Sequence, residues 1–163
     1  MPMSEEQLTQ FVTERRTDKT MKIYLASSWK NAEQVLKMKL ALSGSGYEEV
    51  DAFCDTEADR FVFSFNDLPS VENHNAKSIL HEPQVRRAFE EDKKWLDWAD
   101  VCILILPAGK SAHLEAGYTK GSGKKLIIYQ DEFPFGDFDV MYGFADVVTD
   151  DMGALIAWLD DWS

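Results

Sequence analysis

The chain has 163 residues, 45% of them hydrophobic, which is enough for one globular domain with a sizeable core. Its formal net charge of −12 argues against binding a nucleic-acid polymer, because phosphate contacts need clustered Lys and Arg, but it leaves a free nucleoside or base as a ligand. No stretch approaches about 18 apolar residues, and no apolar signal core opens the chain, so we expect a soluble cytoplasmic protein that makes no membrane contact.

The first twenty residues are polar and charged, and we treat 1–20 as an N-terminal extension to a single domain over 21–163. The pair Ser4 and Gln7 predicts a short helix. One face of this helix would carry Leu8, Phe11 and Val12. The segment is interpreted either as a contact in an oligomer or as a frayed tail.

The domain opens with a strand, a helix and a second strand. Apolar patterning predicts a strand over residues 21–26, a helix over 31–42 and a strand over 48–53, an order that implies a parallel right-handed crossover. The inner stripe of the helix would contain Ala32, Val35, Leu36 and Leu40. Tyr24 lies near the carboxyl end of the first strand, where its ring either packs in the core or points its hydroxyl into a crevice.

Residues 55–82 form the least regular part of the chain. Phe61, Phe63 and Phe65 alternate as in a short strand, but Asn, Asp, Pro and Ser residues make the remainder loop-like. A loop of this length is usually functional or mobile. We interpret it as a lid whose aromatic side chains stack on a flat ligand, and core packing of the phenylalanines is the equal alternative.

The helix predicted over residues 83–98 places a carboxylate in an apolar stripe. At helical spacing the stripe contains Val85, Ala88, Phe89, Asp92, Trp95, Leu96 and Ala99. An unpaired carboxylate is costly to bury, so Asp92 needs either a partner or a cavity. Alternatively, an outward tilt of the helix end would leave Asp92 exposed.

A buried strand over residues 101–106 is followed by a turn and by a helix that ends at Gly121. Ser111 is a good N-cap, so Glu115 would lie early in a helix that starts where a central strand ends, at the edge of an α/β sheet where ligands bind. The alternative is that Glu115 only complements the helix dipole. Cys102, inside the strand, and Cys54 are interpreted as reduced core thiols.

The remaining elements complete an α/β fold. We expect a strand over 125–129, an irregular stretch around 139–142, an edge strand over 145–148 and a closing helix over 152–162. Alternating strands and helices predict a doubly wound, mostly parallel sheet flanked by helices.

Tyr24, Asp92 and Glu115 come from three elements whose ends can converge at one edge of this sheet. Two carboxyl groups that face one small pocket suit acid/base or nucleophilic work on an acetal-like carbon. A first-turn glutamate is favoured as the anion, which suits a nucleophile, and an aspartate in apolar surroundings is favoured in its protonated form, which suits a proton donor. The chain has no dinucleotide-binding glycine motif, no phosphate-loop lysine and no metal-spaced histidines, so neither cofactor nor metal is expected.

Three strings in the sequence resemble the nucleoside 2-deoxyribosyltransferase family over roughly residues 21–158. They are MKIYLASSW, FEEDKKWLDWAD and above all LPAGKSAHLEAGYTKGSGKKLIIY. The last string is similar to the family's nucleophile segment and is closest to a phage and bacterial branch with the SAHLEAGY form. The resemblance implies a flavodoxin-like sheet and a homo-oligomer in which neighbouring subunits close each other's pockets.

The resemblance also implies roles for individual residues. Glu115 would attack the anomeric carbon, Asp92 would exchange a proton with the base, and Tyr24 would position Glu115. Ser111 would bind a sugar hydroxyl. The turn Ser27, Ser28 and Trp29 follows the matching first strand, so we expect it to contact substrate.

The chain departs from the family at two positions. Some members carry an acidic residue where this chain has Gly109, and Ser111 or His113 would replace its sugar contact. His113 is alternatively a capping or solvent-facing residue. Other members use an asparagine in a later segment to reach the 5′ side of the sugar, and Asp139 is the candidate to replace it here. Lys110 beside a helix N-terminus would favour a 5′-phosphate.

The expected activity is cleavage of the N-glycosidic bond of a (deoxy)nucleoside through a glycosyl-glutamate intermediate, with transfer of the sugar to another base. The expected partners are therefore a small nucleoside or nucleotide and a free base. One alternative is a nucleoside or nucleoside 5′-monophosphate N-glycosidase, in which water takes the sugar. The other is a nucleotide-sensing module without turnover.

Overall fold

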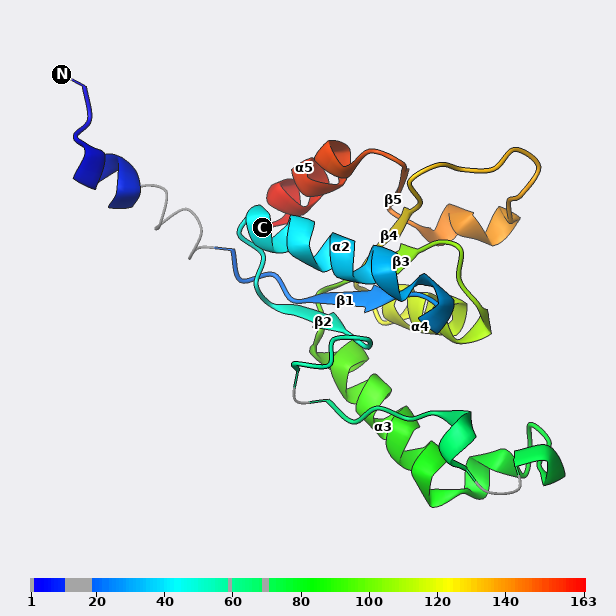
Figure 1. The fold of residues 1–163 in the computed structure, drawn as a ribbon. Helices are drawn as coiled ribbons and strands as arrows, with labels where there is room; N and C mark the ends of the chain where they lie inside the picture. Colours follow the sequence, from blue (N-terminus) through cyan, green and yellow to red (C-terminus); the bar gives the residue numbers. More distant parts are fainter. Residues whose placement is uncertain (1, 11–18, 59, 69–70) are drawn as a thin grey trace.

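The computed structural model describes residues 2–10, 19–58, 60–68 and 71–163 (Figure 1). The predicted N-terminal helix is present over residues 5–10, and it begins with reciprocal hydrogen bonds. The Gln7 amide donates to Ser4 Oγ at 3.1 Å, and the Ser4 amide donates to Gln7 Oε1 at 3.0 Å. Phe11 and Val12, which were expected on the apolar face, lie outside the described residues.

The core of the domain is a five-stranded parallel sheet in the order β2-β1-β3-β4-β5. The strands are β1 Ile23–Ala26, β2 Val50–Ala52, β3 Val101–Ile105, β4 Lys125–Tyr129 and β5 Val147–Thr149. All four neighbouring pairs are parallel. This strand order is that of a flavodoxin-like doubly wound sheet, so the predicted fold class is confirmed.

Helices cover both faces of the sheet (Figure 1). Helices α2 (Ala32–Gly44) and α5 (Met152–Trp162) pack on one face, and α3 (Pro83–Trp98) and α4 (Lys110–Gly121) pack on the other. Short 3₁₀ helices occupy η1 Trp29–Asn31, η2 Phe65–Asp67, η3 Val71–Asn73, η4 Ile79–His81 and η5 Val140–Phe144. Among the described residues, no helix has both the length and the apolar character that crossing a membrane requires.

Successive side chains of each strand point to opposite faces of the sheet, so the core lies in two layers. Ile23 and Leu25 of β1 point to the α2/α5 face, whereas Tyr24 points to the α3/α4 face. In register, Tyr24 lies between Asp51 of β2 and Cys102 of β3. Both cysteines are buried and unpaired, as expected for core thiols. The α3/α4 face therefore receives a tyrosine and a carboxylate from adjacent strands.

Two predicted helix stripes differ from the structure. The buried residues of α2 are Val35, Met38 and Leu42, whereas the predicted Leu36 and Leu40 are exposed. In α3 only Leu96 is buried, and Phe89 is 64% exposed. The 16 residues of α3 span about 24 Å at 1.5 Å per residue, longer than the roughly 17 Å of the five-residue strand β3. The N-terminal half of α3 therefore extends past the sheet (Figure 1).

Candidate active site

Five polar side chains gather on the α3/α4 face of the sheet, and we call them the polar cluster. Its members come from β1, β2, the segment that follows β2, α3 and α4, and they are Tyr24, Asp51, Arg60, Asp92 and Glu115. Both carboxyl groups expected to do chemistry belong to it, and so does the tyrosine. They interact electrostatically with one another on the same side of the sheet.

Tyr24 contributes a hydroxyl that is hydrogen-bonded to Glu115. Its side chain is 1% exposed, which its place on a central strand explains. Burial, and then the nearby charges of Glu115 and Asp92, raise the pKa of Tyr24 far above its ordinary value. The phenol therefore keeps its proton and acts as the donor in its hydrogen bond to Glu115.

Glu115 lies in the second turn of α4, which corrects the expected first-turn position. The helix begins at Lys110 with Gly109 as its N-cap, and Ser111 is not the cap. The helix starts earlier than predicted because only four residues separate β3 from Lys110. The dipole effect falls off within the first turn, so it gives little support to an anion at Glu115.

Burial dominates the electrostatics of Glu115. Desolvation is the largest effect and raises the pKa of its carboxyl to about 7; the Tyr24 hydrogen bond opposes this rise, and the Asp92 charge adds to it. Burial therefore works against the expectation that this glutamate is favoured as the anion. At neutral pH both protonation states of Glu115 are populated.

Asp92 has a partner, as its place in the helix stripe required. Arg60 Nη2 donates to Asp92 Oδ1 at 2.8 Å, and the Asp92 side chain is 40% exposed. The apolar surroundings that were expected to favour protonated Asp92 are not present, because the segment that follows β2 brings Arg60 against its carboxyl group. Its immediate neighbour is a cation rather than a hydrocarbon surface.

Arg60 is in turn anchored on the sheet by Asp51. Its Nε and Nη2 donate to the two oxygens of Asp51 at 3.1 and 3.3 Å, and both side chains are 4% exposed. Burial by itself would lower the pKa of Arg60, but its bonds to Asp51 and Asp92 outweigh this and raise it, so the guanidinium stays charged. Neither residue was selected from the sequence. A polar Asp51 within an otherwise apolar strand was the one available signal.

The turn after β1 is held by its own hydrogen bonds. Ser27 Oγ donates to the Ile105 carbonyl at 2.7 Å, and Ser28 Oγ accepts from the Lys30 amide at 3.2 Å and caps η1. Trp29 is 55% exposed, and its ring packs edge-on against Phe53 with centroids 5.0 Å apart. Substrate contact by these three residues stays a prediction.

The start of α4 is exposed at Gly109, Lys110 and Ser111. His113 Nδ1 lies 2.8 Å from the Gly109 carbonyl oxygen, and its Nε2 lies 3.3 Å from the Tyr142 hydroxyl. The His113 and Tyr142 rings are stacked with centroids 6.0 Å apart. His113 therefore links the first turn of α4 to η5, which agrees with a structural role and leaves substrate contact as a prediction.

Phe65 and Asp139, two further residues predicted to bind substrate, contact residues outside the polar cluster. Phe65 is 56% exposed and packs edge-on against Phe63, with centroids 5.1 Å apart. Asp139 is the N-cap of η5 and accepts from the Met141 amide at 2.8 Å. Among the described residues, no hydrogen bond or ion pair joins either of them to the polar cluster.

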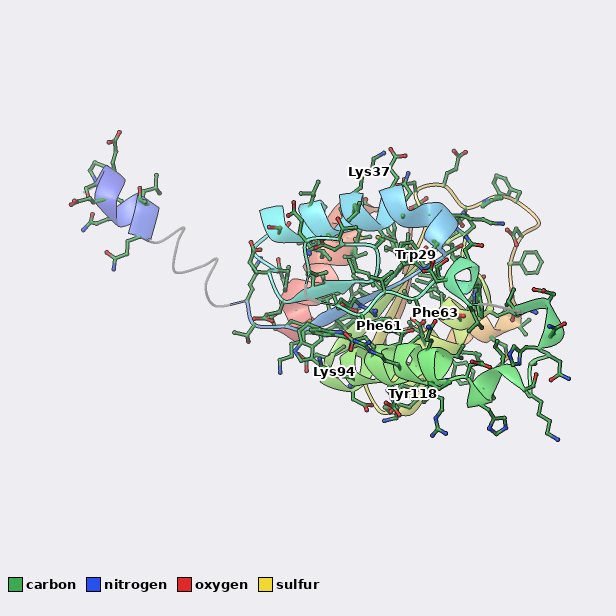
Figure 2. The ribbon with its side chains drawn as sticks, turned by 60° about the horizontal axis from the view of Figure 1, so that its bottom comes forward. Trp29, Lys37, Phe61, Phe63, Lys94 and Tyr118 are labelled. Atoms are coloured by element: carbon green, nitrogen blue, oxygen red, sulfur yellow. The ribbon has the colours of Figure 1, made fainter. Side chains whose placement is uncertain are left out.

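The predicted lid, residues 55–82, is held against α3 by contacts of Phe61, the residue that follows Arg60 of the polar cluster. The Phe61 amide donates to Glu91 Oε1 at 3.4 Å, and the Arg87 guanidinium lies 3.9 Å from the centre of the Phe61 ring. Figure 2 shows Phe61 and Phe63 alongside α3. Phe61 is thus used in packing, whereas Phe65 presents an exposed ring.

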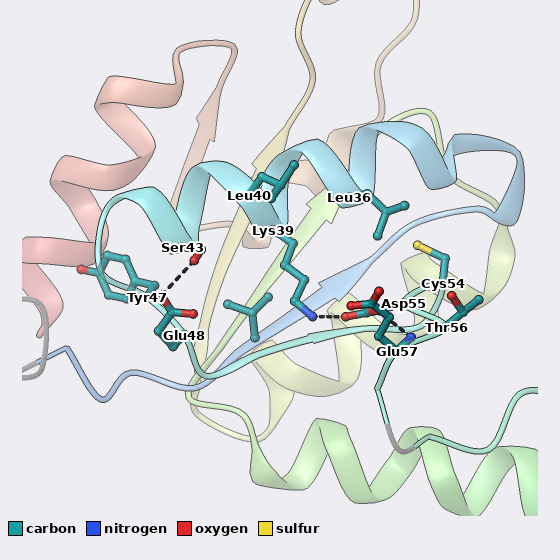
Figure 3. A pocket seen from close by; sticks show the side chains of 11 residues that line it. Leu36, Lys39, Leu40, Ser43, Tyr47, Glu48, Cys54, Asp55, Thr56 and Glu57 are labelled. Carbon is teal, nitrogen blue, oxygen red and sulfur yellow. Dashed lines mark hydrogen bonds and ion pairs between the residues drawn. The ribbon is translucent and has the colours of Figure 1, made fainter.

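A hollow of about 440 Å³ lies on the opposite face of the sheet, between α2 and residues 47–57 (Figure 3). Leu36 and Leu40 line it from α2, and an ion pair between Lys39 and Asp55 crosses it. The sheet separates this hollow from the polar cluster. Within the described part of the chain, no group of three His, Cys, Asp or Glu side chains is placed to hold a metal ion.

Burial of Glu115 leads to a prediction about stability. Because folding raises its pKa from 4.5 to about 7, the folded state holds this proton more tightly than the unfolded state does. The contribution of Glu115 to stability is present below pH 4.5 and is lost as the pH rises through 7. Glu115→Gln cannot lose a proton, so we expect it to be more stable than the wild type by roughly 1–3 kcal/mol at pH 8.

Urea unfolding at pH 5 and pH 8 measures this difference. The difference in the free energy of unfolding between Glu115→Gln and the wild type should be small at pH 5 and larger at pH 8. Glu90→Gln, a change on the exposed face of α3, is the matched control and should show no such increase. An equal difference in the free energy of unfolding at both pH values would contradict the raised pKa of buried Glu115.

Comparisons with known proteins bear on the fold. The solved structure of a 2-deoxyribosyltransferase from Bacillus psychrosaccharolyticus is 22% identical, with a TM-score of 0.54, over 85% of this chain and 95% of that chain. A CMP N-glycosidase from Clostridium botulinum is 16% identical, with a TM-score of 0.49, over 87% and 99%. No model of a protein family matches the chain, and neither does any curated protein. At these identities the chain shares the fold of the first of these enzymes.

Proposed function

We propose that the protein is an enzyme that cleaves the N-glycosidic bond of a (deoxy)nucleoside and transfers the sugar to another base. One observation carries the proposal: the carboxyl groups of Glu115 and Asp92, from two different helices, lie on the same face of the sheet in one polar cluster, with the Tyr24 hydroxyl on Glu115. A pair of this kind suits substitution at an acetal-like carbon.

In the first step, an oxygen of ionised Glu115 bonds to the anomeric carbon. The bond from that carbon to the base nitrogen breaks, and its electron pair takes the proton that Asp92 supplies. Tyr24 donates to the Glu115 carboxylate and orients it. In the second step, the incoming base nitrogen displaces Glu115 and returns a proton to Asp92. The active form therefore carries one proton on the pair, held on Asp92.

The raised pKa of Glu115 favours the proton on Glu115, so the reactive form, with Glu115 ionised and the proton on Asp92, is the minority form. A carboxylate removed from water is a stronger nucleophile, and a pKa near 7 leaves a substantial ionised fraction at neutral pH. The fold shared with a 2-deoxyribosyltransferase supports the proposal, although fold by itself does not determine activity. We further propose that Gly109, Lys110 and Ser111 at the start of α4 contact the sugar or its 5′ substituent.

Hydrolysis is the second candidate, because solvent reaches the polar cluster. The Asp92 side chain is 40% exposed. Water at this position could take the sugar from Glu115 and pass its proton to Asp92. The products would then be the free sugar and the free base.

One experiment separates these activities. The protein is incubated with deoxynucleosides, with and without a second free base, and the products are resolved by chromatography. Exchanged nucleoside that appears only with the second base is the expected result. Free sugar without exchange would favour hydrolysis. Binding of the nucleoside without either product would contradict enzymatic function and favour a sensing module.

We also propose that the protein assembles with copies of itself. The loop around η5 exposes several large apolar side chains, namely Phe135, Phe138, Val140, Met141 and Phe144. Clustered exposure of this kind often marks an interaction surface. Sedimentation velocity would measure the state of association, and a monomer at micromolar concentration would contradict assembly.

A further inference from the structure

Arg60 belongs to the polar cluster, but the mechanism above gives it no role. Its guanidinium joins the sheet to α3, since it bonds both oxygens of Asp51 on β2 and one oxygen of Asp92. It is the one basic residue in the cluster, facing three carboxyl groups. A buried arginine in this setting calls for an explanation.

The backbone that follows Arg60 is held as well. The next residue, Phe61, donates its amide to Glu91 and lies under the guanidinium of Arg87, so two contacts from α3 hold the segment in place. The Arg60 side chain is only 4% exposed, so packing restricts it to one position. Its planar fork is thus held in advance with one edge on Asp51 and one nitrogen on Asp92.

We propose that Arg60 is a positioning residue, which holds the Asp92 carboxyl beside Glu115 and balances the charge of the carboxyl groups that share this face of the sheet. This inference rests on the proposed function for the roles of Asp92 and Glu115. The bond to Arg60 fixes one oxygen of Asp92 and leaves the other to carry the proton for the base.

The surroundings of Glu115 show why a cation is needed there. The titratable groups that face it are Tyr24 from β1, Asp51 from β2, Arg60 from the segment that follows β2, Asp92 from α3 and Cys102 from β3. The two aspartates both raise the pKa of Glu115, whereas Arg60 lowers it. Without the guanidinium, three carboxyl groups would share one partly buried face, and Glu115 would ionise only at higher pH.

Titration of Glu115 tests this role without any assay of turnover. The Glu115 carboxyl signal is followed by ¹³C NMR against pH in protein labelled at glutamate, and Glu115→Gln identifies the signal. In Arg60→Met we expect the midpoint to move up by about one pH unit. In Arg60→Lys, which keeps the charge, it should move by less than about half a unit. An unchanged midpoint in folded Arg60→Met would overturn the proposal.

Turnover of Arg60→Lys tests the geometric part, and it remains available if Arg60→Met does not fold. A single ammonium cannot bond Asp51 twice and Asp92 as well, so we expect kcat to fall about tenfold with little change in KM. The loss should be larger for bases that need a proton to leave. Full activity, or equal losses for all bases, would overturn positioning of Asp92.

Arg86→Met is the matched control, because Arg86 is an exposed arginine on α3, the helix that carries Asp92. This variant should leave both the Glu115 midpoint and turnover unchanged. If the wild type shows no turnover at all, the proposed function fails, while the NMR titration still decides whether Arg60 controls the ionisation of Glu115.

Discussion

Glu115→Gln is expected to reduce nucleoside turnover by at least about a thousandfold. The amide fills nearly the same space as the carboxyl and still accepts the Tyr24 hydrogen bond, but it cannot form an ester with the anomeric carbon. Since the same change should stabilise the protein at pH 8, loss of turnover with a gain in stability would separate a chemical role from a structural one.

The covalent intermediate can be sought directly. A nucleoside with fluorine at the 2-position of its sugar forms the glycosyl ester and releases it slowly, so mass spectrometry of the intact protein should show a sugar adduct on the wild type. Glu115→Gln should show none, and peptide mapping should place the adduct on Glu115. Glu90→Gln should behave as the wild type. An adduct on another residue, or turnover retained in Glu115→Gln, would refute the assignment of the nucleophile.

Asp92→Asn is expected to have an effect that depends on the base. For a base that must be protonated to leave, the loss of a general acid should reduce kcat by about 10²–10⁴-fold. For a 7-methylpurine nucleoside, whose base is already cationic and leaves without a proton, the loss in the first step should be much smaller. Single-turnover measurement of base release compares the two substrates under the same conditions.

Asp97→Asn is the matched control for this experiment. Asp97 lies on the same helix and pairs with Lys93 at the surface, away from the polar cluster. It should leave both substrates unaffected. Because Asp92→Asn also removes one partner of Arg60, circular dichroism and thermal unfolding should accompany the assay; the remaining bonds between Arg60 and Asp51 should keep the fold intact. Equal losses for both nucleosides would remove Asp92 from the role of acid.

Much of the fold follows from local pattern. Buried parallel strands appear as apolar runs, which is why the strands around Tyr24 and Cys102 were found in the sequence, and their alternation with helices led to the doubly wound sheet. The need of Asp92 for a partner also followed from its helix position, since a carboxylate in an apolar stripe cannot stand alone. These inferences depend only on the spacing of apolar and polar residues along the chain, which can be read directly from the sequence.

Three features needed the tertiary structure. Arg60 reaches Asp92 across 32 residues, and nothing in the intervening loop indicates which cation would fill that position. The N-terminal half of α3 extends past the sheet and leaves Phe89 exposed, and the segment that follows β2 gives Asp92 a polar neighbour. Glu115 sits two residues deeper in α4 than predicted, in its second turn, so desolvation, rather than the helix dipole, controls its ionisation.

The sequence by itself thus determined the order of the strands along the chain, the class of the fold and the three residues proposed for the chemistry, because periodicity and residue type are local properties. Only the tertiary structure decided the electrostatics of the polar cluster. Burial and the approach of a distant charge depend on how elements pack, and they set the surroundings of Glu115 and Asp92 opposite to those expected from their places in their own helices.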